Sequence, residues 1–209
     1  MTTAAACSAP FNFFSFDWTP APIQDAELVR QLSFIPLLKE IIILRQVHAL
    51  EHATVWVLGD LQKSAVTETT TVDNGLLSGL STELGFYLYG EVDINALRRA
   101  VPLARYHLTN GKANLAIHPR CGTNLSVEML LTASFAVVAH ILLPRSPLEQ
   151  LIGFGLAATT AAQLAPDLGS LAQQYLTTAI PFNLAIEDIT ATRDAWGRRA
   201  HFVKVCWVD

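Results

Sequence analysis

The sequence predicts an α+β fold with one long apolar helix, a small mixed sheet and an apolar helical hairpin. Three observations support this fold class: an apolar helical pattern near the N-terminus, short β-type segments on either side of a helical one, and two consecutive apolar stretches of helical length. The corresponding ranges are residues 24–58, 85–118, 125–165 and 183–208, within a single domain over residues 24–209. Residues 1–23 are rich in Phe and Pro and are predicted to form an irregular aromatic arm.

The composition excludes several classes of protein. With 51% hydrophobic and 15% charged residues, the chain of 209 residues has ample apolar side chains for a core and is not a disordered protein. The formal net charge of −4 and the lack of a basic run exclude nucleic acid as the main partner, because phosphate recognition needs clustered Lys and Arg. Three scattered cysteines, Cys7, Cys121 and Cys206, are too few for a disulfide scaffold, so a reducing compartment is expected.

The first helix is predicted over residues 24–58. Asp25 and Glu27 suit its N-terminus, where negative charge opposes the helix dipole. Pro36 should kink or divide it, and Gly59 should end it. The Thr and Gly content of residues 60–80 then predicts a loop.

A strand–helix–strand unit is predicted next. Gly85–Gly90 reads as a short aromatic strand, and Asp93 is a suitable cap for a helix over Ile94–Leu108. Asn114–His118 reads as a second strand, which we expect to lie parallel to the first. Pro102, inside the helical segment, is the one residue that opposes this interpretation.

The two apolar stretches, residues 125–143 and 148–165, are predicted to form a helical hairpin around Pro144–Pro147. A helix needs about 20 residues to cross the hydrocarbon core of a bilayer, and each stretch is close to that length. We therefore expect an integral membrane protein with these two helices in contact with lipid, and a soluble helical bundle is the alternative. The small residues of Gly155–Ala162 suit close helix packing in either case.

The C-terminal segment alternates in the manner of a β-hairpin. Residues 183–192 and 200–208 are its predicted strands, joined by a turn at Asp194–Gly197. Glu187 and Asp188 in this hairpin are candidates for an additional carboxylate ligand.

The densest cluster of ligand-capable side chains is His48-Ala-Leu-Glu51-His52 in the first helix. At 3.6 residues per turn, the two imidazoles and the carboxylate share one helix face. The spacing H-x-x-E-H is the inverted form of the zincin helix, in which both histidines bind zinc and the glutamate handles a water proton. The alternative is a pair of histidines that are satisfied by hydrogen bonds in a core or interface.

A second constellation, His118-Pro-Arg-Cys121-Gly-Thr-Asn124, precedes the apolar hairpin. His118 and Cys121 supply a nitrogen and a sulfur ligand of the kind that zinc accepts. Cys121 is also a candidate thiolate nucleophile, because Arg120 and the amides of the next helix would lower its pKa. The structural alternative is a turn with a small buried thiol, in which Thr123 or Asn124 caps the next helix.

The two motifs together support a resemblance. His48-Ala-Leu-Glu-His-Ala-Thr54 and His118-Pro-Arg-Cys-Gly-Thr-Asn124 resemble paired motifs of an uncharacterised bacterial membrane-protein family described as predicted metal-dependent enzymes. The chain is still more similar to a related domain-of-unknown-function family from photosynthetic bacteria, with further matches at Leu80–Gly90 and Leu176–Thr178. The resemblance implies a membrane-associated protein with a metal site at His48, Glu51, His52 and His118, with Cys121 as a further candidate, and it implies no substrate.

These observations lead to three hypotheses. The first is a zinc-type, metal-dependent hydrolase in which His48, His52 and His118 hold a divalent metal, Cys121 is a fourth ligand or a neighbour, and Glu51 activates water. The second is a membrane protein with a structural metal site, and the third is a metal-free helical membrane adaptor. The first two require that stretches 66 positions apart, from His52 to His118, meet within ligand distance.

Overall fold

The computed structural model describes residues 24–65 and 77–208. The aromatic arm predicted for residues 1–23 lies outside the described residues, as does the middle of the loop predicted for residues 60–80. The elements in chain order are α1 Gln24–Gln31, α2 Leu38–Ala65, β1 Ser78–Thr82, β2 Gly85–Tyr89, α3 Ile94–Thr109, the 3₁₀ turn η2 Ala113–Ala116, α4 Gly122–Leu142, α5 Pro147–Ala172, the π-helical turn η3 Gln173–Thr177, β3 Leu184–Arg193 and β4 Arg199–Trp207.

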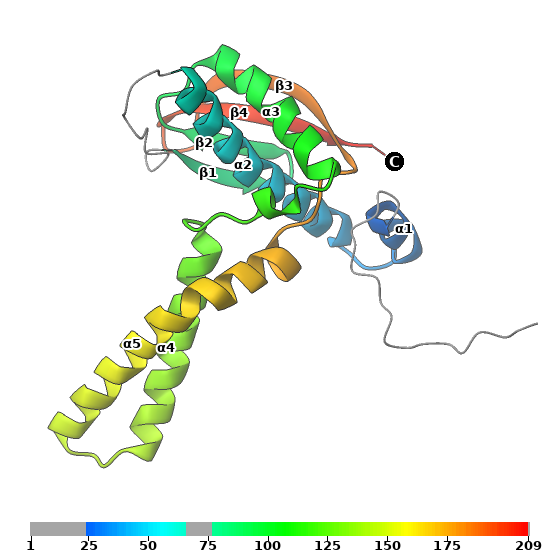
Figure 1. Cartoon of the computed structure of the whole chain (residues 1–209). Coiled ribbons are helices and arrows are strands. Elements are labelled where there is room, and N and C mark those ends of the chain that lie inside the picture. Colours follow the sequence, from blue (N-terminus) through cyan, green and yellow to red (C-terminus); the bar gives the residue numbers. More distant parts are fainter. Residues whose placement is uncertain (1–23, 66–76, 209) are drawn as a thin grey trace, which may run out of the picture.

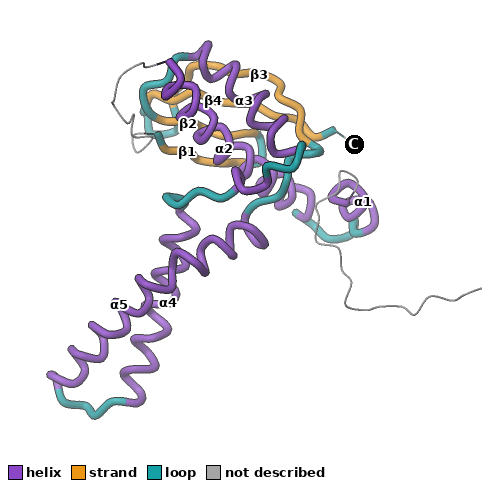
Figure 2. The backbone as a smooth tube through the Cα atoms, in the orientation of Figure 1, coloured by secondary structure: helices purple, strands orange, loops and turns teal. Residues whose placement is uncertain are grey.

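These elements form two parts, and the predicted α+β class is confirmed (Figure 1). In the first part, α2 and α3 lie on one face of a sheet, as the backbone trace also shows (Figure 2). In the second part, α4 and α5 run side by side and project away from the first (Figure 1). The core lies between α2, α3 and the sheet, where Leu50, Leu97 and Phe86 are fully buried.

The first helical segment is divided as Pro36 predicts, because α1 ends at Gln31 and α2 begins at Leu38. The stop predicted at Gly59 is wrong, since α2 continues to Ala65. A glycine inside a helix costs only about 1 kcal/mol relative to alanine. Burial of Val57 and Leu58 in the core offsets that cost and extends the helix.

The sheet has the order β1-β2-β4-β3, and every neighbouring pair is antiparallel. The mixed sheet and its strand–helix–strand unit were therefore wrong. Strand β1 lies where a loop was predicted, and it forms a hairpin with the predicted strand β2. On its other side β2 pairs with β4, and Gly85 permits this close approach, because a Cβ there would lie 1.9 Å from the carbonyl oxygen of Val203.

The segment Asn114–His118 is not a strand, because its backbone finds other partners. Residues Ala113–Ala116 form a 3₁₀ turn. The carbonyl oxygen of Ala116 accepts a hydrogen bond from His52, and that of Ile117 accepts one from the Trp56 indole. Side chains of α2 thus satisfy carbonyl groups that a strand would present to a neighbour.

Helix α3 is confirmed together with its cap. The carboxylate of Asp93 accepts a hydrogen bond of 2.9 Å from the amide of Ala96. Pro102 lies inside the helix with its side chain exposed. Burial of the opposite face, on Leu97, Val101 and Leu108, outweighs the backbone hydrogen bond that the proline removes.

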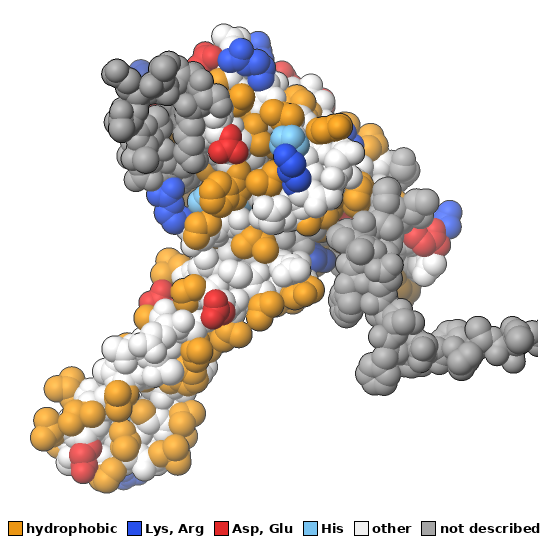
Figure 3. Space-filling model, in the orientation of Figure 1, with side chains coloured by type: hydrophobic (Ala, Val, Ile, Leu, Met, Phe, Trp, Pro, Cys, Tyr) orange, Lys and Arg blue, Asp and Glu red, His pale blue; other side chains and the backbone are white. Residues whose placement is uncertain are grey.

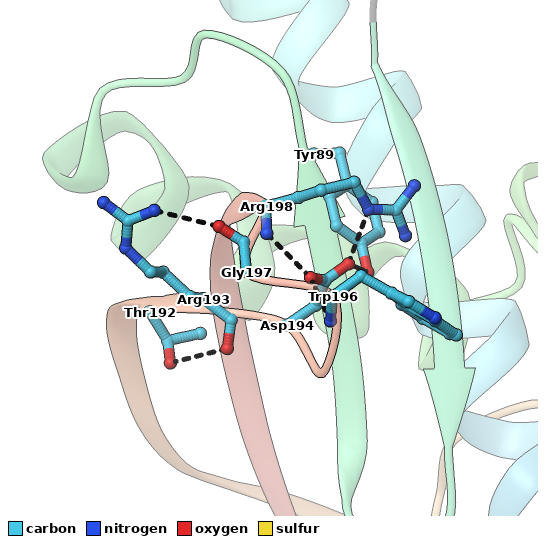
Figure 4. Close-up of polar contacts among 7 residues, drawn as sticks. All are labelled: Tyr89, Thr192, Arg193, Asp194, Trp196, Gly197 and Arg198. Carbon is cyan, nitrogen blue, oxygen red and sulfur yellow. Dashed lines mark hydrogen bonds and ion pairs between the residues drawn. The ribbon is translucent and has the colours of Figure 1, made fainter.

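The C-terminal hairpin is confirmed, and Asp194 organises its turn (Figure 4). The buried carboxylate of Asp194 accepts hydrogen bonds from the amides of Trp196 and Arg198, from the Arg198 guanidinium at 2.7 Å and from the Tyr89 hydroxyl at 3.1 Å. Burial alone would raise the pKa of Asp194, but the hydrogen bonds from Arg198 and Tyr89 outweigh it and lower the pKa.

The variant Asp194→Asn is expected to be less stable than the wild type at neutral pH. Because the pKa of Asp194 is lowered in the folded state, its stabilising contribution is present above the ordinary Asp value of 3.8 and is lost as the pH falls through the lowered pKa. The difference in thermal midpoint should therefore shrink in acid, as measured by circular dichroism. Asp188→Asn, an exposed change in the same hairpin, is the control. A difference that does not change with pH would contradict the role of the charge.

The apolar helical hairpin is also confirmed, and its packing is unusual for a protein surrounded by water. The residues of α5 that are buried against α4 are all small: Gly153, Ala157, Ala161, Ala165 and Gly169. No residue of α4 is buried, and large side chains such as Leu130, Ile141 and Leu156 are exposed. Hydrophobic side chains cover much of the visible hairpin surface, most densely at its far end (Figure 3).

Two described helical segments are long and apolar enough to cross a membrane, Leu38–Leu61 and Gly122–Leu142. The first is mostly buried within the protein, so its apolar character is explained by the core. The second is α4, none of whose residues is buried within the described part of the protein, although one side of it packs on α5. Helix α5, predicted as the other membrane helix, does not meet the same criterion of length and hydropathy.

Candidate metal centre

Three ligand-capable side chains from the two predicted motifs converge. His48 and His52 lie on α2, and Cys121 precedes α4. One ligand atom from each lies within 4.8 Å of the other two, and Nε2 of His48 is 3.3 Å from the Cys121 sulfur. The two stretches therefore meet, as the metal hypotheses require, and the cluster is one that could hold a metal ion.

Backbone carbonyl groups orient both imidazoles. Nδ1 of His48 donates a hydrogen bond of 3.0 Å to the carbonyl oxygen of Thr177, and Nδ1 of His52 donates one of 2.6 Å to that of Ala116. A carbonyl oxygen only accepts, so Nδ1 must carry the proton in each ring. The lone pair of each neutral ring is then on Nε2, which is the arrangement found in metal-binding histidines.

Cys121 supplies the sulfur from the position immediately before α4. It is the N-cap of α4, so neither Thr123 nor Asn124 takes that position, contrary to the structural alternative for this motif. Its sulfur accepts a hydrogen bond from the Thr123 amide at 3.4 Å. Burial raises the pKa of the Cys121 thiol, but its interactions with His52 and Thr123 outweigh burial and lower the pKa, which favours the thiolate that binds metals.

Glu51 lies beside the cluster and is almost completely buried. Its carboxylate accepts a hydrogen bond from the Ser81 hydroxyl. Burial raises the pKa of Glu51, and the hydrogen bond from Ser81 opposes this only in part. Gly79 provides the necessary space, because a Cβ there would lie 2.0 Å from Oε1 of Glu51.

His118 lies close by but outside the group of three donors. Its ring centroid is 5.7 Å from that of His52 and 5.2 Å from that of Trp56. Its Nδ1 accepts a hydrogen bond of 3.3 Å from the amide of Arg120, so Nε2 carries the proton in the neutral ring. Burial, His52 and Arg120 lower the pKa of His118 to about 4. Its predicted role as a ligand stays a prediction.

Gln173, in η3, is a supporting residue that the sequence reasoning missed. It is fully buried, its Oε1 accepts a hydrogen bond from the amide of His118, and its Nε2 donates one to Oδ1 of Asn124. Gln173 thus connects the His118 stretch and the start of α4 to the end of α5. Its only sequence signal is a polar residue at the end of a long apolar helix, which is too common a feature to identify it.

The additional carboxylates predicted in the C-terminal hairpin do not reach this site. Glu187 pairs with Lys204 at 2.9 Å on the sheet, and Asp188 accepts a hydrogen bond from the amide of Ile189. Neither residue lines the cavity at the cluster. Their placement follows from the strand pairing of β3 with β4, which the sequence pattern alone did not relate to α2.

The three donors and Glu51 open into a cavity of about 700 Å³. This volume is in the range of small-molecule and substrate pockets, which is roughly 300–1,000 Å³. Polar side chains, including Ser81 and Thr123, lie near the donors, and the apolar side chains are Ile41, Leu44, Val55, Leu77, Leu80 and Leu176. The cavity lies between α2, β1, the start of α4 and the chain that follows α5.

Comparison with known proteins agrees with the resemblance of the motifs. Residues 43–189 match the model of a domain of unknown function, DUF6391. The chain belongs to this family. An uncharacterised protein of Picosynechococcus sp. is 52% identical over 200 residues, which cover 95% of this chain and 97% of that protein. No solved structure matches the chain. The match includes α2 from residue 43 onward, every cavity-lining residue except Ile41, and the apolar hairpin, so the candidate site lies within the family domain.

Proposed function

We propose that the protein is a membrane-anchored, metal-dependent hydrolase with a zinc-type site at His48, His52 and Cys121. The observation that carries the proposal is that one ligand atom each of His48, His52 and Cys121 lies within 4.8 Å of the other two, beside the buried Glu51 and an open cavity. Buried polar groups are costly unless they have partners, and a metal ion would satisfy all three donors.

The donor set fits a divalent ion of the zinc type. Two imidazole nitrogens and a thiolate are preferred ligands of Zn²⁺, and hard cations such as Mg²⁺ prefer oxygen. Among residues 24–65 and 77–208, the protein supplies three such donors, and their ligand atoms lie within 4.8 Å of one another. A catalytic zinc site commonly has three protein ligands and keeps a position for water or substrate.

Each residue of the site has a proposed role. A bound divalent ion would supply the Lewis acidity that polarises a carbonyl group and activates water. Glu51 would accept a proton from water and return it to the leaving group, since its carboxylate lines the cavity next to His48 and His52. His118 would donate a hydrogen bond from Nε2 to substrate, because Arg120 occupies its Nδ1. Ser81 would hold the Glu51 carboxylate in position.

The hairpin of α4 and α5 would anchor the protein in a bilayer, with lipid as its partner. The support is the distribution of residues in the hairpin, which has small residues between the two helices and large apolar residues on its outer surface. Close packing on small residues is typical of helices in lipid, where large apolar side chains face the acyl chains. Cys121 begins α4 and Thr177 follows α5, so the site would lie at the membrane surface.

A structural metal site is the second candidate, because the same three donors connect α2 to the start of α4. A structural ion normally has four protein ligands, and its removal unfolds or loosens the fold. Chelation separates the two candidates. A protein that keeps its circular dichroism spectrum and thermal midpoint after chelation supports a catalytic site.

The variant Glu51→Gln is expected to keep its metal and to hydrolyse model substrates roughly 10²–10⁴ times more slowly, the usual contribution of a general acid–base group. Metal content would be measured by mass spectrometry on the full-length protein in detergent, and hydrolysis with an activated acetate ester and with casein. Glu83→Gln, an exposed change in the turn between β1 and β2, is the control. Full activity in Glu51→Gln, or wild-type protein without stoichiometric metal, would refute the proposed function.

A further inference from the structure

Strand β1 is an edge of the sheet and also a wall of the cavity. Its pairing partner is β2, and among residues 24–65 and 77–208 no other strand pairs with it. Ser78, Gly79, Leu80 and Ser81 all line the cavity. An edge strand presents unpaired N–H and C=O groups that can pair with another extended chain.

The register identifies which groups face outward. The amide of Val205 donates a hydrogen bond to the carbonyl oxygen of Leu84, so the backbone groups of residues 84, 86 and 88 face β4. Those of residues 85, 87 and 89 then face β1, where they pair with residues 82, 80 and 78. The backbone groups of Gly79 and Ser81 therefore point to the outer edge.

The same two residues contact the proposed general base. Ser81 donates its hydroxyl hydrogen bond to Glu51, and the Cα of Gly79 lies against the Glu51 carboxylate. A chain that paired with Gly79 and Ser81 would thus pass beside Glu51 and over the cavity that holds His48 and His52. Its backbone carbonyl groups would lie within reach of the site.

We propose that the site hydrolyses polypeptides, which bind in extended form by adding a strand to the outer edge of β1. This inference rests on the proposed hydrolase function and names its substrate class. Strand addition supplies affinity through main-chain hydrogen bonds, with pockets for alternate side chains. In the reaction, the oxygen of water bonds to the peptide carbonyl carbon, the C–N bond breaks, and one proton of the water passes to the leaving amine.

A lipid ester is the competing substrate, since the cavity has apolar walls and the proposed site is near a membrane. An acyl chain has no amide groups to pair with Gly79 and Ser81. The edge of β1 beside Glu51, which pairs with no other strand among residues 24–65 and 77–208, therefore favours a polypeptide.

The test is hydrogen exchange of the full-length, zinc-loaded Glu51→Gln variant in detergent, with and without casein. Exchange of the Gly79 and Ser81 amides should slow about tenfold, the effect of roughly one net hydrogen bond. Strand β3, the other edge of the sheet, is the internal control and should be unchanged. Protection of β3 alone, or of neither strand, would overturn the inference.

A second measurement uses a peptide that the wild type has cut from casein. N-methylation removes one amide donor at a time, and a bound strand should tolerate it at alternate residues only. Slower cleavage with a period of two residues supports strand addition, and uniform tolerance overturns it.

The outcomes also separate the inference from the proposed function. Metal binding with ester hydrolysis, but with casein neither cut nor protecting β1, would overturn the polypeptide substrate and leave the hydrolase standing. Protection of β1 by phosphatidylcholine vesicles and not by casein would overturn the polypeptide substrate in favour of a lipid. Absence of metal would refute the hydrolase itself.

Discussion

Replacing His52 with Ala is expected to weaken zinc binding roughly 100-fold or more, and Cys121→Ser should have a similar effect. Zinc sites with four ligands bind with about 10–16 kcal/mol, so each ligand contributes on the order of 3 kcal/mol. His52 and Cys121 are both buried and both belong to the group of three donors. Affinity would be measured on the full-length protein by competition with a chromophoric chelator.

The matched control is His107→Ala, which removes an imidazole from α3 away from the cavity. It should bind zinc as the wild type does. Cobalt gives a second readout, because a cobalt–thiolate bond absorbs in the near ultraviolet and this band should be lost in Cys121→Ser. If His52→Ala and Cys121→Ser keep wild-type affinity while folded, the proposed ligand set is refuted.

The double variant Leu130→Arg, Val137→Arg is expected to prevent stable insertion of α4 into membranes. Both side chains are exposed on α4, which has no buried residue. An arginine near the centre of a membrane helix costs about 2.5–3.5 kcal/mol, so two together should cost about 6 kcal/mol. Wild-type protein should stay in the membrane pellet after alkaline carbonate extraction, and the variant should be released or degraded.

The control for this experiment is Leu103→Arg, which places the same charge on an exposed leucine of α3. It should stay in the pellet like the wild type. Release of the wild-type protein by carbonate would refute a membrane-inserted hairpin. Because the ligand variants and the membrane variants change different elements, one set tests the metal site and the other tests the anchor.

Much of the fold could be predicted because it depends on local signals. The division at Pro36, the Asp93 cap and the two apolar helices follow from backbone sterics, capping and continuous hydrophobicity, all of which act within a few residues. The face shared by His48, Glu51 and His52 follows from helical periodicity alone. The HPRC stretch was recognised as a second half of the site, although its distance from the first half was not known.

The errors of prediction concern long-range partners. Strand β1 comes from a stretch with a weak β pattern and is held by its pairing with β2. Asn114–His118 has the pattern of a strand, but its carbonyl groups bind side chains of α2. In both cases the backbone hydrogen bonds are made with residues that the local sequence does not specify.

By itself, the sequence determined the main helices, the apolar helical hairpin, the C-terminal β-hairpin and the types of residue that could bind a metal, because each depends on composition and spacing within a short stretch of chain. Only the tertiary structure decided that His48, His52 and Cys121 converge, that the carbonyl groups of Thr177 and Ala116 hold Nδ1 of the two imidazoles, and that His118 lies just outside the group. The physical reason is that ligand distance and imidazole orientation depend on carbonyl groups contributed by segments more than 60 positions away along the chain.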